Sequence, residues 1–149
     1  MTERQRAAER PRRTALVLGA ASAVPFIAAA IAAWLLTDSL LANTLVSAAY
    51  LYGAVVLSFL GGIHWGVALR NGNTLARDYW FGVIPALIAW GALLIPMRYG
   101  LLLLAAALAG QFIADLRLSL PYWFRTLRAA LTIVAITSLM LIIAVVWHA

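Results

Sequence analysis

Five polar side chains lie within or beside apolar stretches of the sequence, and their types could do chemistry in a membrane. They are His64 and two pairs, Gln111 with Asp115 and Arg128 with Thr132. The two members of each pair are four residues apart. Residues at this spacing share one face of an α-helix. Ionisable groups in hydrocarbon are costly and normally paired, so we expect Asp115 to accept hydrogen bonds from Arg128 or His64. Such a group could carry a proton or hold the polar head of a ligand.

The composition indicates an integral membrane protein. The 149-residue chain is 65% hydrophobic and 11% charged, whereas soluble domains are typically ~45–50% apolar and ~25% charged. There is no cysteine, which excludes disulfides, thiolate metal sites and cysteine nucleophiles. The net charge of +6 comes from arginine, because the sequence contains no lysine.

Five apolar stretches are long enough to cross a bilayer, which takes roughly 20 residues. We expect an all-α fold, an integral membrane bundle of five transmembrane helices. The predicted spans are at about residues 14–36, 45–69, 79–97, 101–118 and 127–147. A basic cytoplasmic tail at 1–13 would precede this transmembrane domain, which takes up 14–149.

The placement of arginine predicts the orientation of the bundle. With five spans, every arginine except Arg98 lies on one side, in the tail, the second link or the fourth link. Cytoplasmic loops carry an excess of positive charge. We therefore expect the N-terminus in the cytoplasm and the C-terminus outside.

A small-residue seam is predicted on the second span. Ser58, Gly62 and Gly66 follow one another at a spacing of four, which would let another helix approach closely. On a helical wheel His64 faces away from this seam, in a stripe with Leu60. The histidine is thus available to a different neighbour from the one that would pack on the seam.

The predicted depths of the five polar residues agree, since all lie in the cytoplasmic third of their spans. If the helices converge, these residues form a shallow polar pocket that opens to the cytoplasmic leaflet. Other side chains at the same boundary would contact anionic lipid headgroups or a partner protein: Arg70, Arg77, Arg117, Arg125, Trp65 and Trp123.

Four stretches carry a family resemblance. In order they are "LGAASAVPF" (18–26), "YGAVVLSFLGGIHWG" (52–66), "PALIAW" (85–90) and "DLRLSLPYWFRTLRAALT" (115–132). The chain resembles an uncharacterised family of bacterial inner-membrane proteins that is related to the mitochondrial transmembrane protein sixty-nine. The resemblance covers nearly the whole chain after the basic tail. It implies a multi-pass protein of the bacterial inner (cytoplasmic) membrane with no assigned activity.

Several specific chemistries find no support in the sequence. We find no phosphate-binding loop, no Ser/His/Asp array and no set of metal ligands. A bis-histidine haem would need His64 and His148 together, but we expect His64 near the cytoplasmic side of the membrane and His148 near the outer side. We expect no cofactor, no metal and no nucleic-acid partner, and the sequence leans against an enzyme.

Three functions stay open at this point. The first is a non-enzymatic interaction, assembly or lipid-contacting protein, with membrane lipids, a membrane-protein partner or a second copy of the chain bound to it. The second is a proton-coupled transporter or relay component that uses His64 and Asp115. The third is binding of a quinone or another amphipathic ligand in the cytoplasmic-leaflet pocket, with its ring against Trp65 or Trp123.

Overall fold

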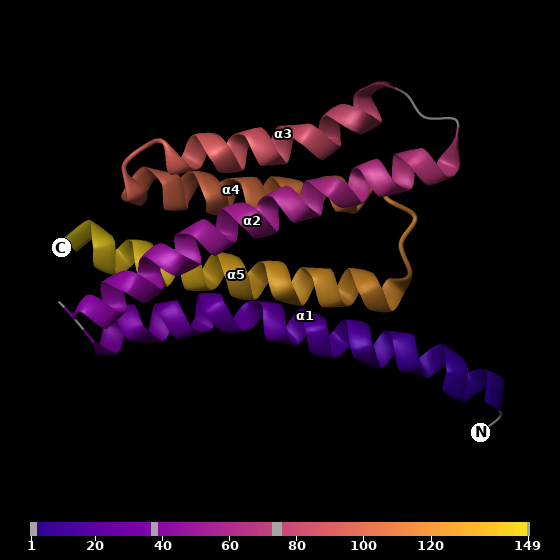
Figure 1. Cartoon of the computed structure of the whole chain (residues 1–149), viewed down its shortest axis with the longest axis horizontal. Helices are drawn as coiled ribbons and strands as arrows, with labels where there is room; N and C mark the ends of the chain where they lie inside the picture. Colours follow the sequence, from indigo (N-terminus) through magenta and orange to yellow (C-terminus); the bar gives the residue numbers. More distant parts are fainter. Residues whose placement is uncertain (1–2, 37–38, 73–75, 149) are drawn as a thin grey trace.

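The protein is a bundle of antiparallel helices in a computed structural model that describes residues 3–36, 39–72 and 76–148 (Figure 1). Its helices are α1 (Glu3–Leu35), α2 (Leu40–Asn71), α3 (Ala76–Leu93), α4 (Met97–Asp115) and α5 (Tyr122–His148). Consecutive helices run in opposite directions, so the chain passes five times between the two ends of the bundle (Figure 1). The predicted all-helical membrane bundle is confirmed.

The lengths of the helices suit a membrane. Among the described residues, α1, α2, α4 and α5 are long and apolar enough to cross one. The apolar part of α3, Tyr79–Leu93, is shorter. The whole of α3 has 18 residues, which makes about 27 Å at ~1.5 Å per residue. It returns the chain from the end of α2 to the start of α4 (Figure 1).

The arginine-rich segments meet at one end of the bundle, which we call the arginine-rich end. It holds the start of α1, the end of α2, the start of α3, the end of α4 and the start of α5 (Figure 1). Arg98, near the start of α4, is at the opposite end. The arginines are therefore distributed between the two ends as expected, and the side of the membrane that each end faces stays a prediction.

The first two helices extend beyond the predicted spans. α1 begins at Glu3, so the arginine-rich segment expected as a tail is helical and continuous with the first span. α2 begins at Leu40 because Ser39 caps it: the Ser39 hydroxyl oxygen accepts from the Ala42 N–H at 3.0 Å. It ends before Gly72, which has a left-handed φ of 66° suited to glycine.

The later helices also differ from the predicted bounds, because apolar runs do not mark capping residues. α3 ends at Leu93 rather than near residue 97, and α4 begins at Met97 rather than near residue 101. The turn between the two helices contains Pro96, which directly precedes α4. α5 begins at Tyr122, directly after Pro121, rather than near residue 127. Proline favours such positions because it lacks the N–H that a helix start leaves unpaired.

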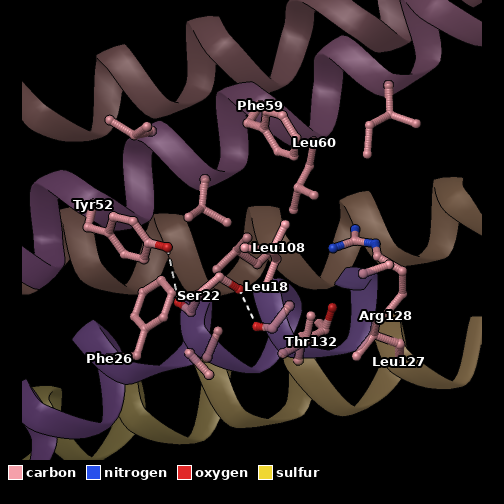
Figure 2. A pocket seen from close by; sticks show the side chains of 18 of the residues that line it. Leu18, Ser22, Phe26, Tyr52, Phe59, Leu60, Leu108, Leu127, Arg128 and Thr132 are labelled. Carbon is pink, nitrogen blue, oxygen red and sulfur yellow. Dashed lines mark hydrogen bonds between the residues drawn. The ribbon is translucent and has the colours of Figure 1, made fainter. Parts of the chain in front are cut away.

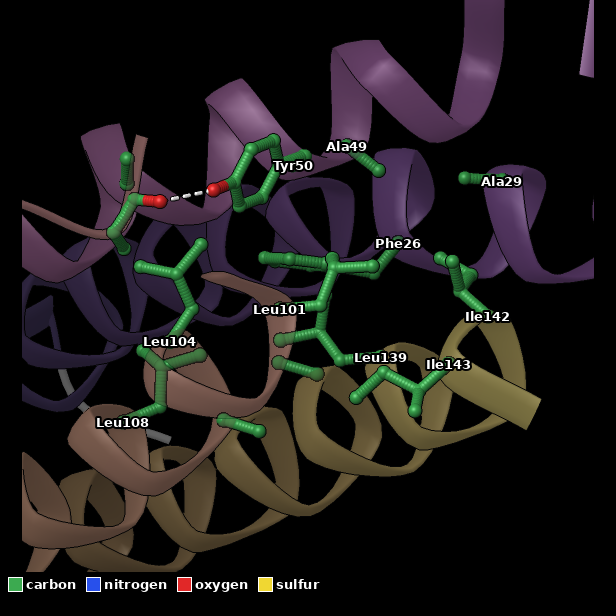
Figure 3. Packing of buried hydrophobic residues seen from close by; sticks show 14 of the residues in the cluster. Phe26, Ala29, Ala49, Tyr50, Leu101, Leu104, Leu108, Leu139, Ile142 and Ile143 are labelled. Atoms are coloured by element: carbon green, nitrogen blue, oxygen red, sulfur yellow. Dashed lines mark hydrogen bonds between the residues drawn. The ribbon is translucent and has the colours of Figure 1, made fainter. Parts of the chain in front are cut away.

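The apolar core joins all five helices, and α3 contributes Ala89 and Ala92 to it (Figure 3). Its largest fully buried side chains are Leu57, Leu101, Leu104, Leu139 and Ile142. The Tyr50 hydroxyl also joins α2 to α3, because it donates a hydrogen bond to the Ala92 carbonyl oxygen (Figure 3). Gly100 of α4 packs against that hydroxyl, and a Cβ on Gly100 would overlap the hydroxyl oxygen.

Two glycines make the close contact between α2 and α3. A Cβ on Gly61 would lie 2.5 Å from the Gly82 carbonyl oxygen and 3.2 Å from the Pro85 side chain. A Cβ on Gly82 would overlap the ring of Trp65. Small residues at both positions therefore let the two backbones approach each other.

The predicted seam of Ser58, Gly62 and Gly66 does not pack helices within this chain. A Cβ added to Gly62 or Gly66 would meet open space, and the Ser58 hydroxyl donates to the Ala54 carbonyl oxygen of its own helix at 2.9 Å. The reason is the rotation of α2. The buried face of this helix is the stripe that contains His64, which leaves the opposite face exposed.

Candidate functional site

Asp115, the last residue of α4, is the centre of a buried polar network at the arginine-rich end. Its Oδ1 atom lies 2.9 Å from Nε2 of His64 on α2 and accepts from Nε2 of Gln111 at 3.1 Å. Its Oδ2 atom accepts from Nε of Arg128 on α5 at 3.0 Å and also from Nη2 of that guanidinium. One carboxylate therefore connects three helices.

The local sequence explains how these groups meet. Gln111 precedes Asp115 by one helical turn and so lies on the same face of α4. His64 belongs to the buried stripe of α2, which faces α4. Arg128 follows the short α4–α5 link and is buried in the second turn of α5. Four of the five residues expected to form a polar site are thus joined by hydrogen bonds.

The charges in this network balance. Arg128 and Asp115 form a buried ion pair, and a carboxylate can only accept hydrogen bonds. His64 can therefore donate from Nε2 as a neutral ring, with no further charge placed inside the bundle. Among the described side chains, no buried nitrogen or oxygen is left without a hydrogen-bond partner. The network as it stands joins helices and leaves Arg128 fixed in one position.

Thr132, the fifth expected residue, is buried one turn after Arg128 and lines a groove beside the network. The groove has a volume of about 410 Å³, within the roughly 300–1,000 Å³ range of small-molecule sites. Figure 2 shows Arg128 near one end, and Phe26 and Tyr52 near the other. Its walls are almost wholly apolar and come from α1, α2 and α5, with Leu108 of α4 between them.

The rim of the groove is exposed. Leu18 on α1, together with Val55 and Phe59 on α2, lines the groove and has most of its side-chain surface outside the bundle. Sequence reasoning missed these three, because an apolar residue at a groove rim has the same pattern as one that faces lipid. Tyr52 was missed as well. Its hydroxyl donates to the Ser22 carbonyl oxygen at 3.0 Å, which holds α2 to α1 at the inner end (Figure 2).

The tryptophans expected to stack on a ligand lie elsewhere. Trp65 covers Gly82, and its Nε1–H donates to the Tyr79 carbonyl oxygen at 2.8 Å. Trp123 packs edge-on against Phe124 and lies 5.8 Å from the Arg12 guanidinium. Neither lines the groove, whose aromatic residues are Phe26, Tyr52, Phe59 and Phe124.

The arginines expected to contact lipid or a partner are exposed at the arginine-rich end: Arg70, Arg77, Arg117 and Arg125. Arg125 donates from Nη2 to the Leu118 carbonyl oxygen at 2.9 Å, which stabilises the α4–α5 link. Within residues 3–36, 39–72 and 76–148, no three His, Asp or Glu side chains gather into a set that could hold a metal ion.

Comparison with known proteins identifies the family. Residues 11–144 match the family model described as "Protein of unknown function (DUF3429)". The chain belongs to this family. It is also 36% identical over 142 residues to "Transmembrane protein 69" of Xenopus tropicalis and 34% identical over 94 residues to the protein of that name in Mus musculus. The predicted relationship to transmembrane protein sixty-nine is confirmed, and the chain is a multi-pass membrane protein of this family.

The matches differ in the share of each protein that they cover. They take in 85% of this chain and 52% of the Xenopus protein, and 58% of this chain and 38% of the mouse protein. The chain therefore spans about half the length, or less, of these curated relatives. No solved structure matches the chain.

Proposed function

We propose that this protein is a non-enzymatic membrane protein that binds an amphipathic molecule with an uncharged polar head in the groove between α1, α2 and α5. The observation that carries the proposal is the shape of the groove. It is apolar along most of its length, with Arg128 toward its arginine-rich end and Thr132 one turn deeper. The hydroxyls of Ser22 and Tyr52 also line it, and each donates to a backbone carbonyl oxygen of α1. A quinone or a neutral glycerolipid has the matching distribution of polar and apolar parts.

The length of the groove matches one leaflet of a bilayer. Its lining residues span 15–26 on α1, 52–63 on α2 and 124–135 on α5. Each stretch covers eleven residue steps, or about 16 Å at ~1.5 Å per residue. This is about half of the ~30 Å hydrocarbon core. A tail in the groove would run from the boundary of the membrane toward its midplane.

The polar end of the groove favours an uncharged hydrogen-bond acceptor. The charge of Arg128 is already balanced by Asp115, which accepts from two of its nitrogens. The guanidinium is fixed before any ligand arrives, so little side-chain entropy is lost on binding. A ligand carbonyl could accept from Arg128 or from the Thr132 hydroxyl.

The alternative, a proton path through His64 and Asp115, receives less support. Proton relays in membranes use successive polar or ionisable groups. Beyond Arg128 and Thr132 most of the lining is apolar, as at Leu108 and Ala135, and the hydroxyls of Ser22 and Tyr52 are engaged with backbone carbonyl oxygens of α1. The described part of the groove is thus better suited to a hydrocarbon tail than to a chain of water molecules.

We also propose that the protein lies in the bacterial inner membrane with its arginine-rich end in the cytoplasm. The support is the arginine distribution, together with the tendency of cytoplasmic loops to hold positive charge. In this orientation the groove and the Asp115 network are in the cytoplasmic leaflet.

Two adjacent residues of α1 provide a matched test of the groove. Leu18 lines it and is 65% exposed, whereas Val17 does not line it and is 67% exposed. Leu18→Trp should fill the groove, and Val17→Trp should add the same bulk where α1 faces lipid. The measurement is mass spectrometry of the organic extract from each purified protein, isolated from native membranes in mild detergent.

We expect wild type and Val17→Trp to retain one enriched lipid or quinone species, and Leu18→Trp to lose most of it. An identical lipid mixture from all three proteins would overturn the proposal. The thermal unfolding of each variant is also measured. A variant that unfolds like wild type but has lost the bound molecule has a filled groove rather than a misfolded chain.

A further inference from the structure

A second cavity lies on the other side of Asp115, at the surface of the arginine-rich end. It has a volume of about 250 Å³, which is room for about eight water molecules at ~30 Å³ each. Its lining residues come from α2, from the first turns of α3, and from the end of α4 with the link that follows: His64, Arg77, Phe81, Ala114, Arg117 and Leu118.

The chemistry of this cavity differs from that of the apolar groove. Two guanidinium side chains, Arg77 and Arg117, reach it from different elements, and none of the described residues that line it is acidic. The ring of His64 forms another part of its wall and is fixed by Asp115 at 2.9 Å. Arginine presents a planar set of donors that matches the oxygens of a phosphate group.

We propose that this cavity binds a phosphate group, with Arg77 and Arg117 as its ligands and the ring of His64 as part of its wall. The remaining lining residues, Phe81, Ala114 and Leu118, provide an apolar wall beside the two guanidinium groups. A phosphate with an attached hydrocarbon chain, as in an anionic membrane lipid, would satisfy both parts. Basic pockets between transmembrane helices bind lipid headgroups in this way.

The phosphate site is independent of the proposed groove ligand. The two cavities approach opposite oxygens of Asp115, because His64 contacts Oδ1 and Arg128 contacts Oδ2. Loss of phosphate binding would leave the groove intact, and a filled groove would leave Arg77 and Arg117 in place. The failure of either proposal can thus be told from the failure of the other.

The test compares two double variants that remove the same charge. Arg77→Gln with Arg117→Gln changes the cavity, whereas Arg12→Gln with Arg70→Gln changes exposed arginines at the same end that do not line it. Affinity is measured by the shift in thermal unfolding of the full chain in neutral detergent. The probes are short-chain phosphatidic acid, short-chain phosphatidylcholine and inorganic phosphate.

We expect phosphatidic acid to bind wild type and the Arg12/Arg70 variant alike, and the Arg77/Arg117 variant about tenfold to a hundredfold more weakly, the range for losing hydrogen bonds to a charged group. Tighter binding of phosphatidic acid than of inorganic phosphate would identify a lipid headgroup as the ligand. Equal binding would identify a soluble phosphate compound with the same chemistry. Equal weakening of both double variants, or no binding to wild type, would overturn the proposal.

A measurement on wild type keeps the proposal testable if the cavity variant does not fold. Phenylglyoxal modifies accessible arginines, and mass spectrometry gives the extent of modification at each one. Phosphatidic acid should protect Arg77 and Arg117 severalfold more than Arg70. Equal protection of Arg70, Arg77 and Arg117 would show that the lipid is attracted to the arginine-rich end without a preferred position. That result would contradict a defined phosphate site.

Discussion

Asp115 shows what one ionisable residue can do at the boundary of a membrane bundle. Its two oxygens accept from His64, Gln111 and Arg128, so α2, α4 and α5 all depend on a single buried carboxylate. Removing one member of a buried ion pair leaves the other charge without compensation, which typically costs about 3–5 kcal/mol. Replacing both members by apolar residues of similar volume costs far less.

At this scale we predict non-additive effects of Asp115→Asn and Arg128→Met. Each single variant should lower the free energy of unfolding by about 3–5 kcal/mol, since each leaves one buried charge unpaired. The double variant Asp115→Asn with Arg128→Met leaves neither charge in the bundle, so its loss should be smaller than the sum of the two single losses. The measurement is thermal unfolding in detergent, with Arg70→Gln as an exposed control.

A double variant whose loss equals the sum of the single losses would contradict this description of the network. Unchanged unfolding of both single variants would show that Arg128 and Asp115 do not depend on each other.

The polar site could be predicted in part from the sequence, because depth follows from position along a span. His64, Asp115 and Arg128 are each a few residues from the same end of an apolar stretch. Their lateral proximity could not be predicted, since the order of helices around a bundle leaves no pattern in the hydropathy. The groove was beyond sequence reasoning for a related reason: Leu18 and Val17 are both apolar and exposed, and only the rotation of α1 distinguishes them.

At the scale of elements, α2 illustrates the difference between a residue pattern and a contact. Gly61 and Gly62 are adjacent and both small, so either could begin a packing face. The structure uses Gly61, against Gly82 of α3, whereas Gly62, about 100° further around the helix, faces open space. The predicted seam failed within this chain because a spacing of four residues marks a possible contact face without identifying the one that is used.

These adjacent glycines make a matched pair of variants. Gly61→Leu should lower the unfolding temperature of the detergent-purified protein, because its side chain would collide with the α3 backbone at Gly82. Overpacking of this kind typically costs about 1–3 kcal/mol, occasionally more. Gly62→Leu should leave the unfolding temperature near that of wild type, since open space surrounds the position.

An equal fall in unfolding temperature for Gly61→Leu and Gly62→Leu would contradict the α2–α3 contact. A larger loss at Gly62 would support the original seam and an interface between two copies of the chain.

At the scale of the whole molecule, hydropathy was enough to predict the fold class and the five helices of the bundle. Apolar stretches must cross the hydrocarbon, and in lipid only helices or closed barrels satisfy their own backbone hydrogen bonds. The helix ends were less predictable because Ser39, Pro96 and Pro121 fix them locally. The continuous α1 was not expected, since charged residues at its start resemble a tail in composition.

The arginine distribution predicts the orientation of the whole bundle. Reporter domains fused to the two ends of the chain should be found on opposite sides of the membrane, the N-terminal one in the cytoplasm, because the arginine-rich end should stay inside. Protease accessibility in sealed membrane vesicles is the measurement. Two reporters on one side would contradict five passes, and exchanged sides would contradict the arginine argument.

If the groove holds one defined amphipathic molecule, photo-crosslinking in native membranes should capture that molecule in place. Phe59 lines the groove, whereas Trp90 on α3 is similarly exposed and does not line it. Each is replaced in turn by the photoreactive analogue p-benzoyl-phenylalanine, the native membranes are illuminated, and the intact protein is weighed by mass spectrometry. We predict one dominant adduct mass at position 59 and a broad mixture of bulk lipids at position 90. The same broad mixture at both positions would contradict the account.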